Sequence, residues 1–235
     1  RFDDMLAALR TAKSGDVVLL HGCCHNPTGA NLDAAQWEAV ADLVVERDLL
    51  PFVDIAYQGF GDGLEADAVG LRLLAAKVPE MVVASSCSKN FAVYRDRVGA
   101  AMILARDGAQ ADVAMSQMLS AARAMYSMPP DHGAAAVRIV LEDAALRADW
   151  EAELEEMRLR MLRLRVQFAE ALRRQSNSDR FDFVASHRGM FSRLGLTEAQ
   201  VERLRAEHGV YMVGDSRINV AGLPEDGMDK LAKAI

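Results

Sequence analysis

Short apolar runs alternate with longer amphipathic stretches along the first half of the chain. Asp33–Arg47 has apolar residues at helical spacing, and Asp33 and Gln36 are placed as in an acidic variant of the capping box. This alternation predicts βαβ units and a largely parallel sheet. Apolar runs with the length of strands are Asp16–His21, Leu50–Ile55, Met81–Ser85 and Gly99–Ala105.

Helical periodicity continues beyond these runs. Leu64–Val78 is predicted as a second helix, and Asp107–Met125 as a third, with Asp107 as its N-cap. Pro129 and Pro130 then interrupt the pattern. The charged stretch from about Asp143 to Arg174 keeps helical spacing without Pro or Gly, and a helix of that length usually connects two units.

The last part of the chain has the pattern of a small α+β domain. Thr197–Glu207 is predicted as a helix, and Met228–Ile235 as a further one. Stretches predicted as strands are Phe181–Ala185, Met190–Leu194, Tyr211–Val213 and Arg217–Val220. The fold class expected is therefore α/β, with a mostly parallel sheet flanked by helices and a small C-terminal α+β domain joined to it by a long helix.

Composition narrows the functional classes. A hydrophobic content of 51% suits a globular core, and a net charge of -7 gives no reason to expect nucleic acid or an anionic membrane as a partner. The apolar runs are far shorter than the ~20 residues of a membrane-spanning helix. The cysteines, Cys23, Cys24 and Cys87, suit free thiols in a reducing compartment, so a cytoplasmic location is expected.

All but one of five chemically informative signals lie where a predicted strand ends or just after it, the edge at which open parallel sheets bind ligands. They are the turn His25–Gly29, Asp54, Lys89, Arg97 and Arg217. A carboxylate at a strand end requires a cationic partner, and arginine forks suit carboxylates and phosphates. Taken singly, each is also explained by a turn, a salt bridge, a solvated lysine or a surface arginine.

Together, in this order, these residues resemble the aspartate and aromatic aminotransferases, family I of the fold-type I pyridoxal-phosphate enzymes. The likeness covers nearly the whole chain. The blocks that carry it are His21–Gly29, Ala56–Phe60, Ser85–Phe91, Arg97–Ala100, Tyr126–Pro130 and Arg217–Gly222. The resemblance implies that residues 1–142 are the C-terminal part of the large cofactor-binding domain and that residues 143–235 form the long linking helix and the small domain.

The resemblance also implies roles around pyridoxal 5'-phosphate. Lys89 would hold the cofactor as a Schiff base and move the substrate proton, and Asp54 would pair with the pyridinium nitrogen. Tyr57 and Asn26 would bind the phenolic oxygen of the ring. Lys89, Tyr57 and Asp54 are thus the expected catalytic residues.

Further residues would bind the phosphate and the substrate. The resemblance implies that Ser86, Ser88 and Arg97 would bind the phosphate. Arg217, with Asn26 beside it, would bind the α-carboxylate of the substrate as a bidentate pair. Arg123 matches the residue that reaches from a neighbouring subunit to the second carboxylate of dicarboxylic substrates, which implies a homodimer with shared active sites.

A metal site is the main competing interpretation, because His21, Cys23, Cys24 and His25 have the side chains that zinc prefers. On a strand, however, Cys24 points away from His21 and Cys23, and no second ligand pair follows. We expect no metal. Cys87 and Met128 depart from the family pattern, where Tyr and Asn are frequent, and the family's N-terminal segment has no counterpart in this chain.

The sequence thus predicts an aminotransferase that moves an amino group from L-aspartate or an aromatic L-amino acid to 2-oxoglutarate. Its partners would be amino-acid and 2-oxo-acid substrates. Two alternatives stay open at this stage. One is a non-catalytic fragment or interaction domain, and the other is a different pyridoxal-phosphate reaction such as aspartate decarboxylation.

Overall fold

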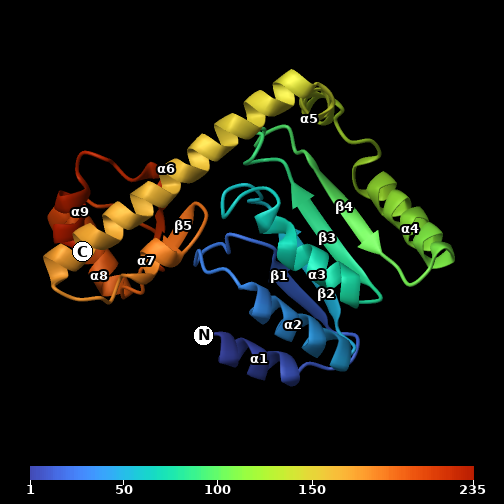
Figure 1. The fold of residues 1–235 in the computed structure, drawn as a ribbon, viewed down its shortest axis with the longest axis horizontal. Helices are drawn as coiled ribbons and strands as arrows, with labels where there is room; N and C mark the ends of the chain where they lie inside the picture. The colour runs from blue at the N-terminus through green and yellow to red at the C-terminus, as the bar shows by residue number, and fades with distance from the viewer.

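The computed structural model describes residues 1–235 and contains two sheets joined by one long helix (Figure 1). The larger sheet has the order β1-β2-β3-β4. Strands β1, β2 and β3 are parallel and β4 is antiparallel, so the expected mostly parallel sheet is confirmed. The strands are β1 (Val17–His21), β2 (Leu50–Ile55), β3 (Met81–Ser86) and β4 (Gly99–Leu104).

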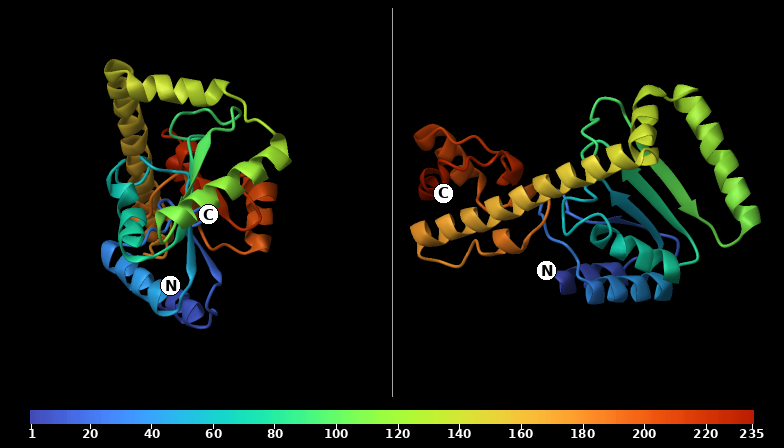
Figure 2. Two further views of the ribbon diagram at one scale, coloured as in Figure 1. Left: turned by 90° about the vertical axis from the view of Figure 1, so that its right-hand side faces the viewer. Right: turned by 45° about the horizontal axis from the view of Figure 1, so that its top comes forward.

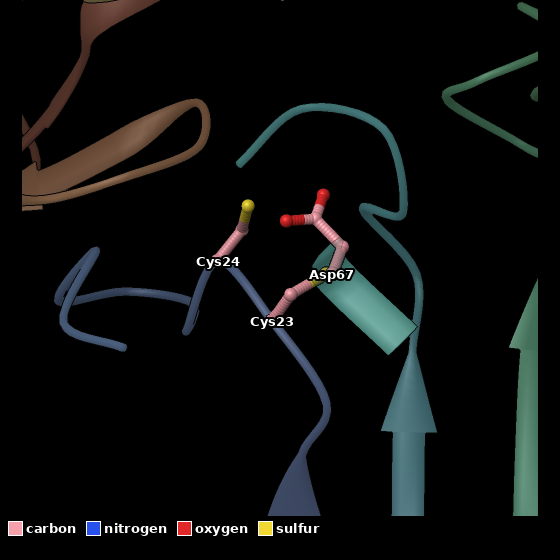
Figure 3. Close-up of side chains that lie close together, drawn as sticks. All are labelled: Cys23, Cys24 and Asp67. Carbon is pink, nitrogen blue, oxygen red and sulfur yellow. The ribbon is translucent and has the colours of Figure 1, made fainter. Parts of the chain in front are cut away.

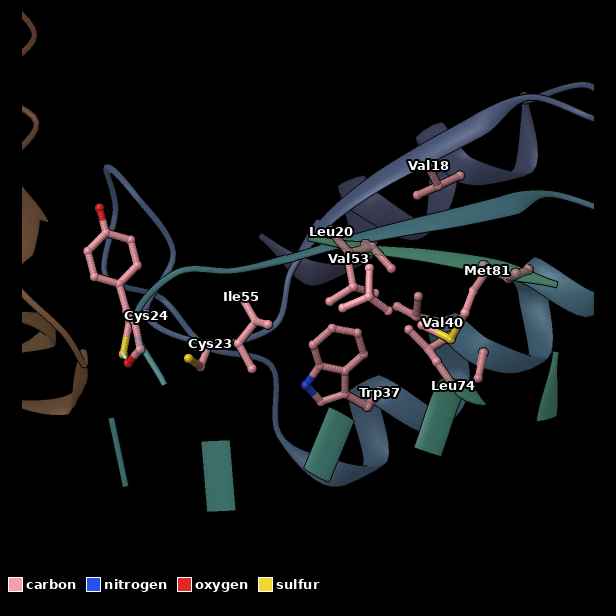
Figure 4. Close-up of a cluster of buried hydrophobic side chains, with 14 of the residues drawn as sticks. Val18, Leu20, Cys23, Cys24, Trp37, Val40, Val53, Ile55, Leu74 and Met81 are labelled. Atoms are coloured by element: carbon pink, nitrogen blue, oxygen red, sulfur yellow. Dashed lines mark hydrogen bonds between the residues drawn. The ribbon is translucent and has the colours of Figure 1, made fainter. Parts of the chain in front are cut away.

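Helices cover one face of this sheet. They are α1 (Phe2–Arg10), α2 (Ala34–Glu46) and α3 (Val69–Lys77), the last preceded by the short 3₁₀ helix η1 (Ala66–Ala68). In the core beneath them, Trp37 and Leu74 meet the inward side chains of the strands (Figure 4). On the opposite face, Val17 and Leu19 are 59% and 61% exposed, so β1 is covered on one side only.

Local capping sets the ends of two helices as predicted. The carboxylate of Asp33 accepts the N–H of Gln36, whose side chain accepts the N–H of Asp33, so the capping box of α2 is present. The Asp107 carboxylate accepts the N–H of Gln110 and opens α4 (Gly108–Tyr126). Helix α4 lies beyond β4 and buries none of its residues.

Two helices follow α4. Helix α5 (His132–Glu142) leads into α6 (Ala144–Ser176), which runs from the large sheet to the small unit (Figure 2). Leu154 and Met161 of α6 belong to the core of the large sheet. Leu164 and Phe168 belong to a second core. One continuous helix therefore joins both cores.

The small unit surrounds this second core. Its strands β5 (Phe191–Arg193) and β6 (Arg217–Asn219) pair in antiparallel fashion, with Arg193 opposite Arg217. Its other elements are α7 (Phe183–Ser186), α8 (Glu198–His208), the 3₁₀ helix η2 (Val220–Gly222) and α9 (Met228–Ala234).

Several predicted elements were wrong. Phe181–Ala185 is not a strand, since this stretch leads into α7 and buries Phe181 and Val184, whose spacing of three residues is helical. Tyr211–Val213 is not a strand either, because no partner strand covers it and Tyr211 is exposed. The predicted helix Leu64–Val78 is shorter and divided into η1 and α3. The sequence patterns did not identify α1 and α5 as separate helices.

None of the helices combines the length and the apolar character that crossing a membrane demands.

Candidate active site

The carboxyl ends of β1, β2 and β3 meet at one edge of the large sheet, as parallel strands must. Asp54, near the end of β2, lies in register with His21 of β1 and Ala84 of β3. The loop after β1 carries Asn26, and the loop after β3 carries Lys89. Residues that the sequence singled out separately are therefore placed along one edge.

Four of these side chains come together from distant parts of the chain. Nη1 of Arg217 donates to Oδ1 of Asn26 at 3.4 Å. Nδ2 of Asn26 in turn donates to the hydroxyl of Tyr57 at 3.4 Å. Nζ of Lys89 lies 4.8 Å from the centroid of the Tyr57 ring. A cation, an amide, a phenol and a second cation thus form one continuous polar group.

Burial strengthens the preference of the Tyr57 phenol for its protonated form. It raises the pKa of the phenol above its usual value, the Asn26 hydrogen bond acts in the opposite direction, and the negative charge of Asp54 raises the pKa further. The phenol consequently stays protonated at neutral pH. It can donate a hydrogen bond to an acceptor oxygen of a bound ligand.

Ser86 ends β3, Ser88 directly precedes Lys89, and Arg97 lies before β4 in the same connection. Oγ of Ser86 donates to Oγ of Ser88 at 3.1 Å and accepts the N–H of Ser88. Arg97 is exposed, and its Nη1 donates to the carbonyl of Tyr94 at 3.0 Å. Arg97 makes no hydrogen bond with either serine, so its guanidinium still has donors for an anion.

Arg217 begins β6 directly after a tight turn. Ser216 is fully buried with φ +64°, and its hydroxyl accepts the N–H groups of Gly195 and Leu196. The guanidinium of Arg217 lies 5.3 Å from the ring of Phe191 in β5. The backbone turn and the aromatic ring together hold Arg217 toward Asn26.

The segment after Lys89 is fixed by α6. Nε1 of Trp150 donates to the carbonyl of Asn90 at 2.6 Å, and its ring stacks on Phe91 with centroids 4.3 Å apart. Nδ2 of Asn90 donates to the carbonyl of Gln58, the residue after Tyr57. Helix α6 and the loop after β2 therefore both hold the backbone beside Lys89.

Arg123 does not join this group. It is exposed on α4, and its guanidinium makes no hydrogen bond or ion pair within the chain. Sequence patterns did not identify two residues of the site. Phe191 supports Arg217, and His21 stacks on His25 while its Nδ1 accepts the N–H of Asn26. Taken as a single residue, His21 was considered in the sequence only as a metal ligand. Its place at a strand end was a signal that it could instead hold the backbone of Asn26.

Two buried thiols and a buried carboxylate lie close together (Figure 3), and Sγ of Cys24 lies 3.9 Å from the carbonyl oxygen of Tyr57. Ligand-type atoms of Cys23, Cys24 and Asp67 lie within 4.8 Å of one another. Asp67 accepts N–H bonds from Gly59, Gly61 and Asp62. The carboxylate thereby fixes the loop that follows Tyr57, which gives Asp67 a structural role.

Replacing Asp67 by Asn will lower the free energy of unfolding by about 2–4 kcal/mol. One acceptor oxygen becomes an NH₂ group, which cannot accept the backbone N–H groups that face it, so buried donors lose their partner. Urea unfolding measures the loss. Asp62→Asn, which alters an exposed carboxylate of the same loop, is the control. Equal losses in the two variants would contradict the role given to Asp67.

Two half-buried histidines make stability depend on pH. Burial is the main cause that lowers the pKa of His25 and of His187, with the nearby His21 and Arg165 as further causes. The unfolded chain then binds more protons than the folded chain as pH falls below the usual histidine value of about 6.5. Their contribution to stability is present above that value and is lost on acidification.

The free energy of unfolding will accordingly fall between pH 7 and pH 5, and the fall will be shallower for His187→Gln. Urea titrations at several pH values test this. His208→Gln, at an exposed position, should keep the steep profile. An unchanged slope in His187→Gln would refute the assignment.

The donor set suits a phosphorylated aromatic cofactor. Hydroxyls of Ser86 and Ser88 and the guanidinium of Arg97 could donate hydrogen bonds to a phosphate, whereas Asp54, Tyr57 and Asn26 have a carboxylate, a phenol and an amide that could bind a heterocyclic ring. Fold and site together have the form of an α/β protein with a lysine in the loop at the carboxyl edge of its parallel strands. The comparisons with known proteins name its family.

The chain belongs to the aminotransferase class I and II family, which it matches over residues 1–235. It is 56% identical to an aromatic-amino-acid aminotransferase of Paracoccus denitrificans and 51% identical to an aspartate aminotransferase of Escherichia coli, over 234 residues each. Both matches cover 100% of this chain. The chain spans 59% of the length of these two relatives.

Solved structures agree with this family. An aromatic amino acid aminotransferase with 3-indolepropionic acid superposes with a TM-score of 0.97 at 56% identity, covering 99% of this chain and 60% of the other. The aromatic-amino-acid aminotransferase of Burkholderia pseudomallei, described as covalently bound to pyridoxal phosphate, has a TM-score of 0.95 at 47% identity. That match covers 100% of this chain and 59% of the other.

Proposed function

We propose that the protein carrying this chain transfers an amino group from L-aspartate or an aromatic L-amino acid to 2-oxoglutarate, with pyridoxal 5'-phosphate held by Lys89 as a Schiff base. The observation that carries the proposal is the contiguous group of Arg217, Asn26, Tyr57 and Lys89 at the edge of a parallel sheet. It connects a carboxylate-binding fork to an amine through one amide and one phenol.

When bound, pyridoxal phosphate supplies an electron sink that stabilises negative charge at the substrate Cα. Asp54 would pair with the protonated ring nitrogen, and its carboxylate would keep that proton in place. The protonated phenol of Tyr57 and the amide of Asn26 would bind the ring oxygen. Ser86, Ser88 and Arg97 would bind the phosphate, which fixes the position of the ring.

The substrate would lie between the two cations. Arg217 binds the α-carboxylate through two parallel hydrogen bonds and so orients the Cα–H bond toward the amine of Lys89. Lys89 would then take the proton from Cα as a general base and deliver it to the cofactor as a general acid. Asn26 contacts Arg217 directly and keeps the guanidinium in this orientation.

Names of relatives support both substrate classes. Similar proteins are named as aromatic-amino-acid aminotransferases and as aspartate aminotransferases. The alternatives of a non-catalytic domain or of aspartate decarboxylation have no such support. Free Cys23, Cys24 and Cys87 favour a reducing compartment, and we extend the proposal to a cytoplasmic enzyme.

Arg123 is the residue we propose for the second carboxylate of aspartate, contributed across a homodimer with shared active sites. Its exposed guanidinium has no partner within its own chain. Arg123→Leu is therefore expected to lower kcat/KM for aspartate about 100-fold while leaving that for phenylalanine within about threefold, since one charged hydrogen-bonding pair is lost. Steady-state kinetics with both donors measures the ratio, and equal losses would refute the role.

Borohydride reduction followed by peptide mass spectrometry tests the proposed function most directly. Reduction fixes the Schiff base as a stable amine, so the expected product is a pyridoxyl group on Lys89. A visible absorption band of the protein with added pyridoxal phosphate should also change on adding aspartate. A pyridoxyl group on another lysine would contradict the role of Lys89. The absence of any pyridoxyl group would contradict pyridoxal phosphate as the cofactor.

A further inference from the structure

Arg165 is the most deeply buried charged residue of the chain. It lies on α6 with 0% exposure, and no carboxylate pairs with it. Burial lowers its pKa to about 10, so the guanidinium still carries its charge at neutral pH. Burying a charge without a counter-ion costs free energy, and an apolar side chain would fill the same position at a lower cost. Core stability alone therefore does not explain an arginine here.

The hydrogen bonds of Arg165 converge on one segment. Nη2 donates to the carbonyls of Gly189 and Phe191, both at 2.7 Å, and to that of Arg188 at 3.1 Å. Nη1 donates to the hydroxyl of Ser192 at 2.7 Å and to the carbonyl of Val184. One guanidinium thus fixes the loop 188–191 and the start of β5.

That segment contacts the proposed active site from two sides. The N–H of Arg188 donates to the carbonyl of Gly29, in the turn that carries Asn26. The ring of Phe191 lies 5.3 Å from the guanidinium of Arg217 and meets the ring of Tyr57 edge-on at 6.3 Å. A shift of the segment would displace the support of Arg217 and of Asn26 together.

Through strand pairing, Arg165 also affects the position of the Arg217 backbone. Ser192 lies opposite Ile218, and Arg193 lies opposite Arg217. Because Arg165 holds Ser192 and the carbonyl of Phe191, it fixes the strand against which β6 is aligned. Arg165 donates no hydrogen bond to Arg217 or Asn26, so any effect on them is indirect.

We infer that Arg165 is a positioning residue for substrate binding, which fixes loop 188–191 and β5 so that Phe191 and Arg217 face Asn26 in the geometry that receives a carboxylate. This inference rests on the proposed function. It adds that carboxylate affinity depends on a buried arginine outside the site.

The test uses the natural protein loaded with pyridoxal phosphate and 3-indolepropionate, a carboxylate without an amino group. Arg165→Lys keeps the charge but loses the fork of parallel donors. We expect the dissociation constant of 3-indolepropionate, measured by calorimetry on this variant, to rise at least about tenfold. That is the size of effect expected for the loss of one charged hydrogen bond. The absorption spectrum of the bound cofactor should stay unchanged, since Lys89 lies beside the other core.

Phe168→Leu is the matched control, because Phe168 is fully buried on the same helix and in the same core but donates nothing to the loop. It should lower Tm and leave the dissociation constant within about twofold. Equal losses of affinity in the two variants, or none in Arg165→Lys, would show that Arg165 only stabilises the core and would overturn the inference.

Ser192→Ala decides the question if Arg165→Lys does not fold. It removes only the bond between Ser192 and Arg165, and an increase of about threefold in the dissociation constant is expected. An unchanged constant would overturn the inference. Failure of the unmodified protein to carry the cofactor on Lys89 is a different result, since it would overturn the proposed function and remove the basis of this role.

Discussion

Replacing Lys89 by Arg will lower kcat at least about 1,000-fold. Proton transfer by a positioned general acid–base group typically contributes about 10²–10⁴-fold. Arginine keeps its proton at neutral pH, so it can neither take the proton from Cα nor form a Schiff base. The length and charge of the side chain stay similar, which leaves the contact with the Tyr57 ring available.

Steady-state turnover of aspartate and phenylalanine measures this effect, with Lys77→Arg as the control. Lys77 is paired with Glu38 and Asp42 at the surface, on a helix away from the site, and an arginine can keep both pairs. Lys77→Arg should therefore retain full turnover. A Lys89→Arg variant that keeps more than about a tenth of kcat with an unchanged Tm would disprove the catalytic role.

Arg217→Leu is expected to lower kcat/KM about 1,000-fold for every amino-acid donor. Hydrogen bonds to a charged group contribute about 1.5–3 kcal/mol each, and two of them at the midrange amount to about 4.5 kcal/mol, or roughly three powers of ten. The loss should appear for aspartate and for phenylalanine alike, because both carry the α-carboxylate. This uniform loss distinguishes Arg217 from Arg123.

Arg193→Leu is the control for Arg217. Arg193 lies directly opposite Arg217 in the β5–β6 pair but is exposed, and its Nε donates to the carbonyl of Asp215. It shares the strand environment without bonding to Asn26. If Arg193→Leu lowers kcat/KM as much as Arg217→Leu does, the loss is caused by disturbing the small sheet and not by removing the guanidinium of Arg217.

Strong local signals made much of the fold predictable. The capping box at Asp33 and the N-cap at Asp107 are short-range patterns, and both helices begin where these patterns indicate. Parallel strands followed from apolar runs separated by helical stretches. Short apolar stretches were less reliable, because Phe181–Ala185 has too few residues for its periodicity to separate a strand from a turn of helix.

The site required the fold and the resemblance as well as local patterns. Arg217 and Asn26 are 191 residues apart, and no local pattern joins them. Arg165 does not stand out in the sequence, because a charged residue on a long helix is usually solvated. The spacing of Met161, Arg165, Phe168 and Leu172 by four, three and four residues places Arg165 on the apolar stripe, and that register was the available signal.

Helix α6 has a consequence for how such chains can vary in length. Trp150 holds the segment beside Lys89, and Arg165 holds the segment beside Arg217, on one uninterrupted helix. Inserting one residue between them would turn one end by about 100° and shift it by about 1.5 Å relative to the other. Insertions and deletions can therefore accumulate in surface loops, whereas the number of residues between Trp150 and Arg165 is fixed by the distance between the segments beside Lys89 and Arg217.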